Sequence, residues 1–224
     1  MSNKILIKIF NDFVEKYNID TNCNLFDIDE NLNVNTILYG KTKLVLKRSS
    51  SMEKQLILEV NKVINDYNNQ SLIYDGLIYM MYKKIDNKIV PLYIGKSEKF
   101  GKNKQNLSIN IKNIEKNNDK FCRWGYNYSY HIGDLSAIVL NGHNESKITN
   151  KYNSWADSIF RGTKTNHPQL KTNIYFWIKA WSNDDIGLWN EFGKTSLTFL
   201  EYQMIGVCSK LFPDDLLNFE GVNR

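Results

Sequence analysis

The most informative segment of the chain is Gly76–Gly95, which reads Gly-Leu-Ile-Tyr-Met-Met-Tyr-Lys-Lys-Ile-Asp-Asn-Lys-Ile-Val-Pro-Leu-Tyr-Ile-Gly. Its first part, Leu77–Tyr82, is apolar and aromatic, as expected of a half-buried β-strand. The polar residues around Asp86-Asn87 favour a tight turn, and Ile89–Ile94 is a second apolar run. The segment therefore predicts a β-hairpin.

Two tyrosines occupy matching places in this hairpin. Tyr79 lies near the start of the first strand, and Tyr93 lies near the end of the second. Such positions can be close neighbours across an antiparallel pair. Tyrosines in most hairpins serve only to pack, so the rest of the chain determines whether this pair has a function.

The hairpin resembles the two motifs that name the GIY-YIG nuclease family. The second motif is intact as Tyr93-Ile94-Gly95, whereas the first is Leu77-Ile78-Tyr79, with its glycine displaced to Gly76. In that family the two tyrosines lie beside one divalent metal ion and the scissile phosphate. The resemblance therefore implies that Tyr79 and Tyr93 are catalytic.

Length and composition predict a globular protein with one sizeable core. The chain has 224 residues, of which 42% are hydrophobic and 24% charged, and this excludes a disordered chain. No apolar run is long enough to span a bilayer, and the first residues do not follow the pattern of a signal peptide. Three scattered cysteines match no metal-ligand spacing, so we expect a reducing, cytoplasmic location and no membrane partner.

The net charge of +5 permits a polyanionic partner but does not require one. Four lysines follow the hairpin closely: Lys96, Lys99, Lys102 and Lys104. Lysine clusters on loops are usually solvated surface. If the family resemblance holds, however, this cluster lies where a phosphate backbone passes, and we expect Lys96, Lys99 and Lys102 to bind nucleic acid.

Residues 1–70 predict a helical N-terminal extension that packs on a nuclease-like domain of residues 71–224. Asn3–Tyr17 has apolar residues at helical spacing, Lys43–Lys47 alternates like a short strand, and Ser50-Ser51-Met52-Glu53 is a capping box that starts a second helix. This extension has two interpretations. It contributes to DNA contact or dimerisation, or it is plain scaffolding.

The segment Phe121–Ser136 combines Arg123, Trp124 and His131 with further aromatic residues. Such a mixture suits stacking or cation–π contact with nucleic acid, and it equally suits an aromatic subcore that contains an ion pair. GIY-YIG nucleases carry an arginine after the hairpin, and Arg123 matches it. The family's nearby histidine or tyrosine has two candidates here, Tyr126 and His131.

The C-terminal part predicts a third strand at Asn173–Trp181 and a helix at Ser196–Leu211. Glu201 adjoins the apolar stripe of that helix. From the residues alone, Glu201 is either at the boundary of the apolar stripe, with its carboxylate in water, or points inward as a ligand. The resemblance implies that Glu201 is the metal-binding carboxylate, and that Asn218, or as second choice Asn223, is the family's asparagine beyond the helix.

These features predict an α/β (α+β) fold with a small, mainly antiparallel three-stranded sheet flanked by helices. The resemblance implies a restriction-type endonuclease that cleaves double-stranded DNA with Mg²⁺ or Mn²⁺ bound by Glu201. Cutting both strands with one site per chain favours a homodimer. The alternatives are a homing or repair nuclease, and a non-catalytic nucleic-acid-binding protein that retains the fold.

The resemblance also implies a role for each catalytic side chain. Tyr79 is the general base and Tyr93 orients the water or phosphate, while His131 is a competing base because histidine titrates near neutral pH. Arg123 binds the non-bridging phosphate oxygens. Lys96 holds the phosphate or polarises a tyrosine, and Asn218 holds neighbouring groups in place.

Overall fold

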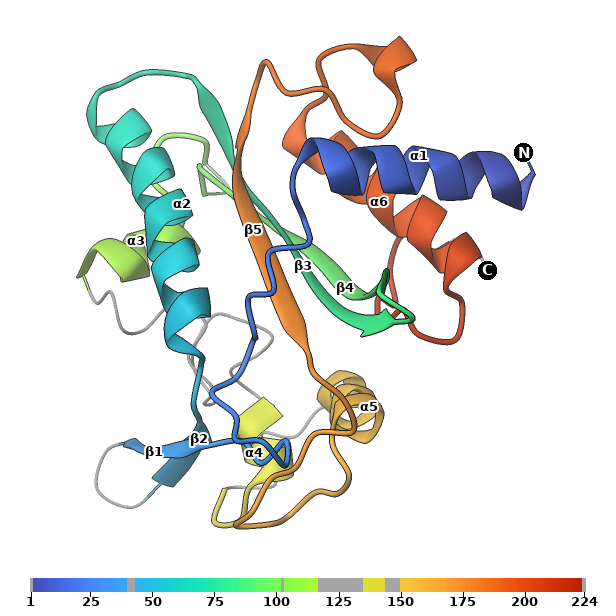
Figure 1. Ribbon diagram of the computed structural model, residues 1–224. Coiled ribbons are helices and arrows are strands. Elements are labelled where there is room, and N and C mark those ends of the chain that lie inside the picture. The colour runs from blue at the N-terminus through green and yellow to red at the C-terminus, as the bar shows by residue number, and fades with distance from the viewer. Residues whose placement is uncertain (1, 40–42, 102, 117–134, 144–149, 223–224) are drawn as a thin grey trace.

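The computed structural model describes residues 2–39, 43–101, 103–116, 135–143 and 150–222. At its centre is a three-stranded antiparallel sheet with strand order β4-β3-β5 (Figure 1). Its strands are β3 (Tyr74–Ile85), β4 (Lys88–Glu98) and β5 (Tyr175–Ser182). The predicted antiparallel sheet flanked by helices is thereby confirmed, and both hairpin strands extend beyond the apolar runs that predicted them.

A two-residue turn joins β3 to β4. Asp86 and Asn87 have φ angles of 49° and 59°, and Ile85 pairs with Lys88 across the turn. Left-handed residues at both central positions give a turn whose twist matches that of the strands, and Asp and Asn tolerate this conformation. The sequence prediction of the hairpin is confirmed at its turn.

The opposite end of β3 requires a glycine. Gly76 has a φ of 151° and lies at a register shift between β3 and β5. A Cβ atom built on it would lie 2.1 Å from the carbonyl oxygen of Ser97, so no side chain fits. The displaced glycine of the first motif therefore has a local structural reason.

Helices cover both faces of the sheet (Figure 1). On one face, residues such as Leu77, Tyr79 and Tyr93 pack against α2 (Ser50–Asn68). On the other face, Ile78 and Met80 pack toward two helices that cross each other, α1 (Asn3–Lys16) and α6 (Leu197–Leu211). Alternate side chains of each strand thus feed two separate apolar clusters.

The N-terminal residues contribute to both clusters. α1 buries Phe10 and Phe13 against the α6 side, and α2 buries Leu56 and Val60 against the other. In the chain, these helices are separated by β1 (Thr36–Tyr39) and β2 (Lys43–Leu46), which form a separate two-stranded antiparallel sheet. The predicted helices and short strand are therefore present, and the helices belong to the central core.

The start of α2 differs by one residue from the prediction. Ser49, and not Ser50, is the N-cap, and its hydroxyl accepts a hydrogen bond from the Met52 N–H at 3.0 Å. Glu53 pairs with Arg48 at 2.7 Å instead of closing a capping box. Three consecutive serines offer the same capping chemistry, and the ion pair with Arg48 favours the earlier one.

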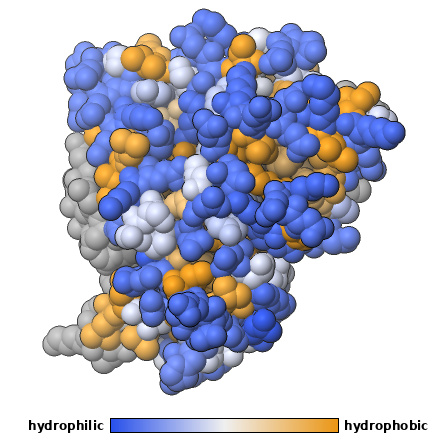
Figure 2. Space-filling view, viewed as in Figure 1, coloured by the Kyte–Doolittle hydropathy of each residue, from blue (hydrophilic) through white to orange (hydrophobic). Residues whose placement is uncertain are grey.

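Further helical elements complete the described part of the chain. Their bounds are α3 (Ile109–Lys116), α4 (Leu135–Val139), α5 (Asn150–Ile159) and η2 (Asn190–Phe192). α4, which could be a strand or a buried helix by its sequence, is a short helix with every side chain buried. In the described part of the chain, no helix combines the length and the apolar character that crossing a bilayer demands. Figure 2 shows a mainly hydrophilic face interrupted by smaller hydrophobic areas.

Candidate functional site

Tyr79 and Tyr93 lie on the same face of the hairpin and form one aromatic group. Their ring centroids are 6.3 Å apart. The ring of Tyr79 stacks on Phe176 at 6.1 Å, and that of Tyr93 contacts Trp155 at 4.5 Å. Both tyrosines are buried, with exposed fractions of 3% and 7%.

Gly95 provides the space that Tyr79 occupies. The two residues are partners across the strands, and a Cβ atom at position 95 would lie 2.4 Å from the phenol oxygen of Tyr79 and 2.5 Å from its Cζ atom. The ring therefore lies directly over the glycine backbone. The glycine of the second motif is thus needed to place the tyrosine of the first.

Glu201 of α6 reaches the outer edge of β4. This strand is last in the sheet order, so alternate backbone groups face away from β3. The backbone of Lys96 hydrogen-bonds to the Glu201 carboxylate at this edge. Burial raises the pKa of Glu201, the Lys96 charge opposes that shift, and the negative charge of Glu98 adds to it.

Glu201 also interacts electrostatically with Tyr93. Burial is the main cause that raises the pKa of Tyr93 above its usual value, and the charges of Glu201 and Glu220 raise it further. The carboxylate therefore lies at the strand edge within electrostatic reach of Tyr93. Segments that are far apart in the sequence meet here.

Asn218 closes the same edge beside Glu201. Its side-chain oxygen accepts a hydrogen bond from the Ile94 N–H at 3.0 Å, and its amide nitrogen donates to the Ile94 carbonyl at 2.8 Å. The neighbouring Leu217 N–H donates to the Leu92 carbonyl at 2.7 Å. Asn218 thus holds the backbone on the C-terminal side of Tyr93 through both ends of its amide group.

Lys96 connects β4 to the start of α6. Its ammonium donates to the Glu98 carboxylate and to the Thr198 hydroxyl, the latter at 2.6 Å. The Lys96 side chain is 19% exposed. It therefore lies beside Glu201, at the boundary between the protein and solvent.

Lys99 corrects the prediction of a nucleic-acid-binding surface. Its side chain is 1% exposed, it forms an ion pair with Asp66, and it donates to the Ser71 carbonyl at 2.8 Å. A buried and paired lysine cannot reach a phosphate backbone. The loop-like sequence context hid this partner, because Asp66 comes from α2, far earlier in the chain.

Several predicted residues fall outside the described part of the chain. These residues are Lys102, Arg123, Trp124 and His131, together with the alternatives Tyr126 and Asn223. Their roles stay predictions from the sequence.

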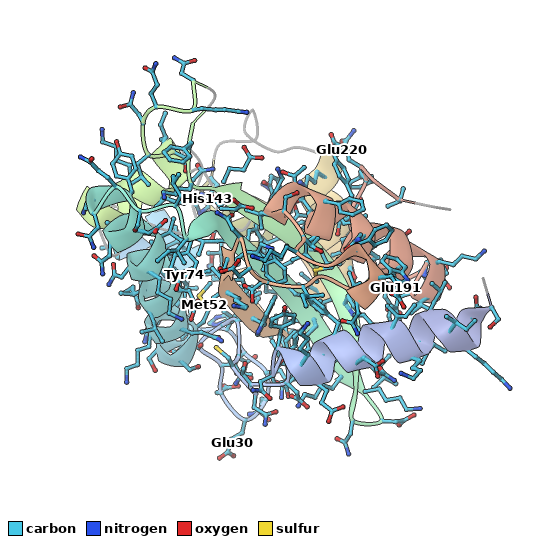
Figure 3. All side chains as sticks on the ribbon, turned by 90° about the horizontal axis from the view of Figure 1, so that it is seen from above. Glu30, Met52, Tyr74, His143, Glu191 and Glu220 are labelled. Carbon is cyan, nitrogen blue, oxygen red and sulfur yellow. The ribbon has the colours of Figure 1, made fainter. Side chains whose placement is uncertain are left out.

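Lys151 and Glu220 belong to the site although the sequence analysis did not select them. The Lys151 ammonium lies 5.1 Å from the ring centroid of Tyr93 and 5.6 Å from that of Trp155. Burial lowers the pKa of Lys151, and the nearby charge of Glu220 opposes this shift. Glu220 follows α6 in the chain (Figure 3). The only sequence signal for Lys151 is its place at the start of a helix that carries Tyr152 and Trp155.

The donor set suits a hard divalent cation. The Glu201 carboxylate supplies an oxygen ligand of the kind that Mg²⁺ and Mn²⁺ prefer, and the charges of Glu98 and Glu220 raise its pKa by their negative potential. A cation bound there would relieve that potential. The described residues contain no group of three or more His, Cys, Asp or Glu side chains placed to hold a metal.

Comparisons with protein-family models, with curated proteins and with solved structures find no match to this chain.

Proposed function

We propose that this protein is a metal-dependent endonuclease that cleaves double-stranded DNA, similar to the restriction members of the GIY-YIG family. One observation carries the proposal: Glu201 of α6 lies at the outer edge of β4 within electrostatic reach of Tyr93, whose ring neighbours that of Tyr79 on the central strand β3. Asn218 lies on the same edge, in the order along the chain that the resemblance implies. A purely structural aromatic cluster would not need the carboxylate.

Hydrolysis of a phosphodiester needs an activated water and stabilisation of the charge on the phosphate. Bound Mg²⁺ or Mn²⁺ supplies charge neutralisation and a more acidic water. Glu201 is the residue that would hold this ion. Arg123 donates hydrogen bonds to the phosphate oxygens, as the resemblance implies, and Lys96 adds positive charge beside Glu201.

The two tyrosines are suited to different tasks. The raised pKa of Tyr93 keeps its phenol protonated at neutral pH, so Tyr93 holds and orients its neighbours and does not abstract a proton. The base is then Tyr79 or His131. The Lys151 ammonium, 5.1 Å from the Tyr93 ring, provides positive charge on this side of the site.

The test is incubation of the purified chain with varied duplex DNA in Mg²⁺, in Mn²⁺ or in EDTA, followed by mapping of the ends. We expect cleavage with either cation and none with the chelator. Glu201→Gln removes the charged ligand but keeps its shape, and it should lower the cleavage rate by about 100-fold or more. Circular dichroism checks that this variant folds.

Glu30→Gln is the matched control. Glu30 is an exposed glutamate, and Figure 3 shows it on the opposite side of the molecule from Glu220. This variant should cleave like the parent chain. Cleavage that persists in EDTA, or an undiminished rate in Glu201→Gln, contradicts the proposed role of a metal at Glu201.

The burial of both phenols favours a second candidate function, a non-catalytic nucleic-acid-binding protein. With 3% and 7% exposure, Tyr79 and Tyr93 pack like core residues. Such a protein would bind DNA with salt-dependent affinity, equally well in EDTA and after Glu201→Gln, and would never cut it. The same incubation, with a binding assay beside it, separates the two functions.

A further inference from the structure

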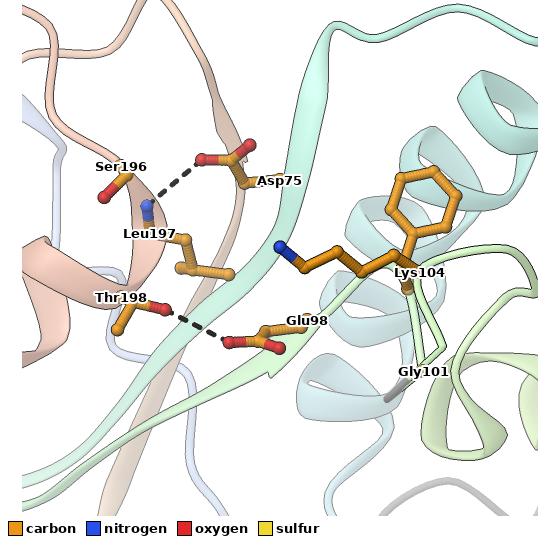
Figure 4. A pocket seen from close by; sticks show the side chains of 8 residues that line it. Asp75, Glu98, Gly101, Lys104, Ser196, Leu197 and Thr198 are labelled. Carbon is orange, nitrogen blue, oxygen red and sulfur yellow. Dashed lines mark hydrogen bonds between the residues drawn. The ribbon is translucent and has the colours of Figure 1, made fainter.

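A cavity of about 350 Å³ opens between the end of β4 and the start of α6 (Figure 4). Its lining includes side chains of Asp75, Glu98, Phe100, Lys104, Ser196 and Thr198. This volume falls within the range of small-ligand sites. The cavity adjoins the candidate active site, because Lys96 donates a hydrogen bond to Thr198, and Glu201 follows Thr198 by one helical turn.

One wall of the cavity is an aromatic ring with a fixed position. The ring of Phe100 makes an edge contact with Tyr67 at 6.1 Å, and the buried Lys99 ammonium lies 5.1 Å from its centroid. The backbone of Phe100 also forms a bridge with Leu107, which is 5% exposed. A ring held on these sides offers a preformed surface for stacking.

The polar groups of the cavity are mainly acceptors. Asp75 accepts a hydrogen bond from the Leu197 N–H at 3.1 Å, and Glu98 accepts one from Thr198 at 3.1 Å. Each carboxylate has a second oxygen that can accept from a ligand. Figure 4 shows the Lys104 side chain extending toward Asp75 and Glu98. Two carboxylates disfavour a phosphate inside the cavity, whereas Lys104 can hold one at its rim.

We propose that this cavity receives one nucleobase of the DNA substrate, extruded from the duplex or already unpaired, that carries an exocyclic amino group. The inference rests on the proposed endonuclease function. Phe100 stacks on the base, and Asp75 and Glu98 accept hydrogen bonds from its amino group, as acidic side chains do from cytosine N4. Thymine, whose base edge carries carbonyl oxygens, is disfavoured at this position.

The position of the cavity links recognition to cleavage. Thr198 and Glu98, which line the cavity, accept hydrogen bonds from the Lys96 ammonium. The backbone of Lys96 in turn hydrogen-bonds to Glu201. A base bound here places its own strand beside the metal-binding carboxylate. The unstacking that this requires is cheapest at a mismatched or single-stranded position.

The experiment uses Glu201→Gln, which holds DNA without cutting it, as the background chain. 2-Aminopurine, a fluorescent base with an exocyclic amino group, is placed at each position of single-stranded and duplex oligonucleotides in turn. We expect the fluorescence to rise at one position upon binding, because that base leaves the stack. Adding Phe100→Leu should abolish this rise and weaken binding by about 10-fold.

One control lies outside the cavity, and two further variants change its lining. Phe192→Leu alters another exposed phenylalanine, and it should leave signal and affinity unchanged. Asp75→Asn should remove the discrimination against thymine at the responding position. Lys104→Met, on the surface, should weaken DNA binding without changing base preference. This variant replaces Phe100→Leu as the test of the cavity if Phe100→Leu does not fold.

Two outcomes overturn the inference and are distinguishable. If the background chain shows no salt-dependent DNA binding, the endonuclease proposal fails and this inference fails with it. If the chain binds DNA but no position responds, or if Phe100→Leu behaves like Phe192→Leu, the base-binding cavity alone is refuted.

Discussion

At the scale of single residues, the contact between Tyr79 and Gly95 determines how the two motifs of the hairpin fit together. The phenol ring covers a glycine on the neighbouring strand, and this lets it stack on Phe176 and approach Tyr93. A glycine in a strand normally weakens the strand, because it has no side chain to pack. Here the ring of the opposite residue fills that space.

Gly95→Ala tests this contact. The added Cβ would lie 2.4 Å from the Tyr79 phenol oxygen, so the ring must move or the strands must separate. We expect a loss of about 1–3 kcal/mol in the free energy of unfolding, measured by urea denaturation. Gly162→Ala is the control, because a Cβ atom there meets nothing within 4 Å. Equal stability of the two variants would contradict this packing.

At the scale of elements, the outer edge of β4 is covered by the C-terminal part of the chain. An uncovered strand edge exposes unpaired backbone groups that can pair with another molecule. Here Asn218 takes both backbone groups of Ile94, and Glu201 bonds to the backbone of Lys96. The same contacts that would position the Glu201 carboxylate for catalysis also satisfy the backbone groups at the edge of the sheet.

Asn218→Ala should therefore destabilise the protein more than an ordinary amide substitution. It leaves the N–H and C=O groups of Ile94 buried without their partner, which costs about 1–3 kcal/mol. Urea denaturation gives the size of the loss, and faster hydrogen exchange of the Ile94 amide locates it. Asn11→Ala, an exposed change on α1, should have little effect. Unchanged exchange at Ile94 would contradict the assignment.

The buried ion pair between Asp66 and Lys99 joins α2 to the end of β4. Burial raises the pKa of Asp66, but hydrogen bonds from Lys99 and Ser71 outweigh it and leave this pKa below 3.8. A carboxyl group with a lowered pKa in the folded state stabilises the fold above its unfolded pKa, and that contribution is lost as the pH falls through the folded value. The pair should therefore matter most at neutral pH.

Lys99→Met is predicted to cost about 3–5 kcal/mol at neutral pH, because it leaves a buried carboxylate without its cation. The difference from the parent should shrink below pH 3.8, where a carboxyl group of ordinary pKa becomes protonated and no longer needs a cation. Urea denaturation at neutral and acidic pH measures both. Lys88→Met, an exposed lysine at the hairpin turn, is the control. A loss that is independent of pH would contradict the electrostatic explanation.

Elements that depend on neighbours in sequence were predictable. The strands β3 and β4 and their Asp86-Asn87 turn follow from local pattern and turn chemistry, and the helix around Glu201 follows from its apolar spacing. The partners of charged side chains were not predictable in the same way. Lys99 looked like surface because its loop is polar, and only the folded chain brings Asp66 to it.

At the scale of the whole molecule, the N-terminal helices are part of the core that supports the site. Phe10 and Phe13 of α1 belong to the same apolar cluster as Trp177 and Trp181, and Leu56 and Val60 of α2 belong to the other cluster. Removing these helices takes away part of the apolar cover on both faces of the three-stranded sheet.

A fragment of residues 71–224 is therefore predicted not to fold on its own. With much of the apolar cover gone from both faces, it should lack the near-ultraviolet circular dichroism of packed tyrosine and tryptophan and should unfold without a cooperative transition. The intact chain is the reference. A fragment with a sharp urea transition and native-like aromatic signals would show that residues 71–224 form an independent domain.

The residues of the candidate site could be predicted only where a motif or a family resemblance pointed to them. Tyr79, Tyr93, Lys96 and Glu201 were selected from their order along the chain. Tyr93 and Lys96 lie on the edge strand β4 with Glu201 beside them, whereas Tyr79 lies on the central strand and neighbours Tyr93. Lys151 was missed, since its position over Tyr93 depends on how α5 packs and leaves no trace in spacing. The burial of both phenols was likewise set by long-range packing.

The ribosome makes Glu201 and Asn218 about a hundred residues after β4. The outer edge of β4 therefore stays uncovered during that part of synthesis. An mRNA that is truncated before the codon for residue 201 would yield a chain with a complete β3–β4 hairpin but an uncovered outer edge of β4. Such truncated products should aggregate or need chaperones. Under the proposed endonuclease function, such unfinished copies would also lack Glu201 and would not cut DNA.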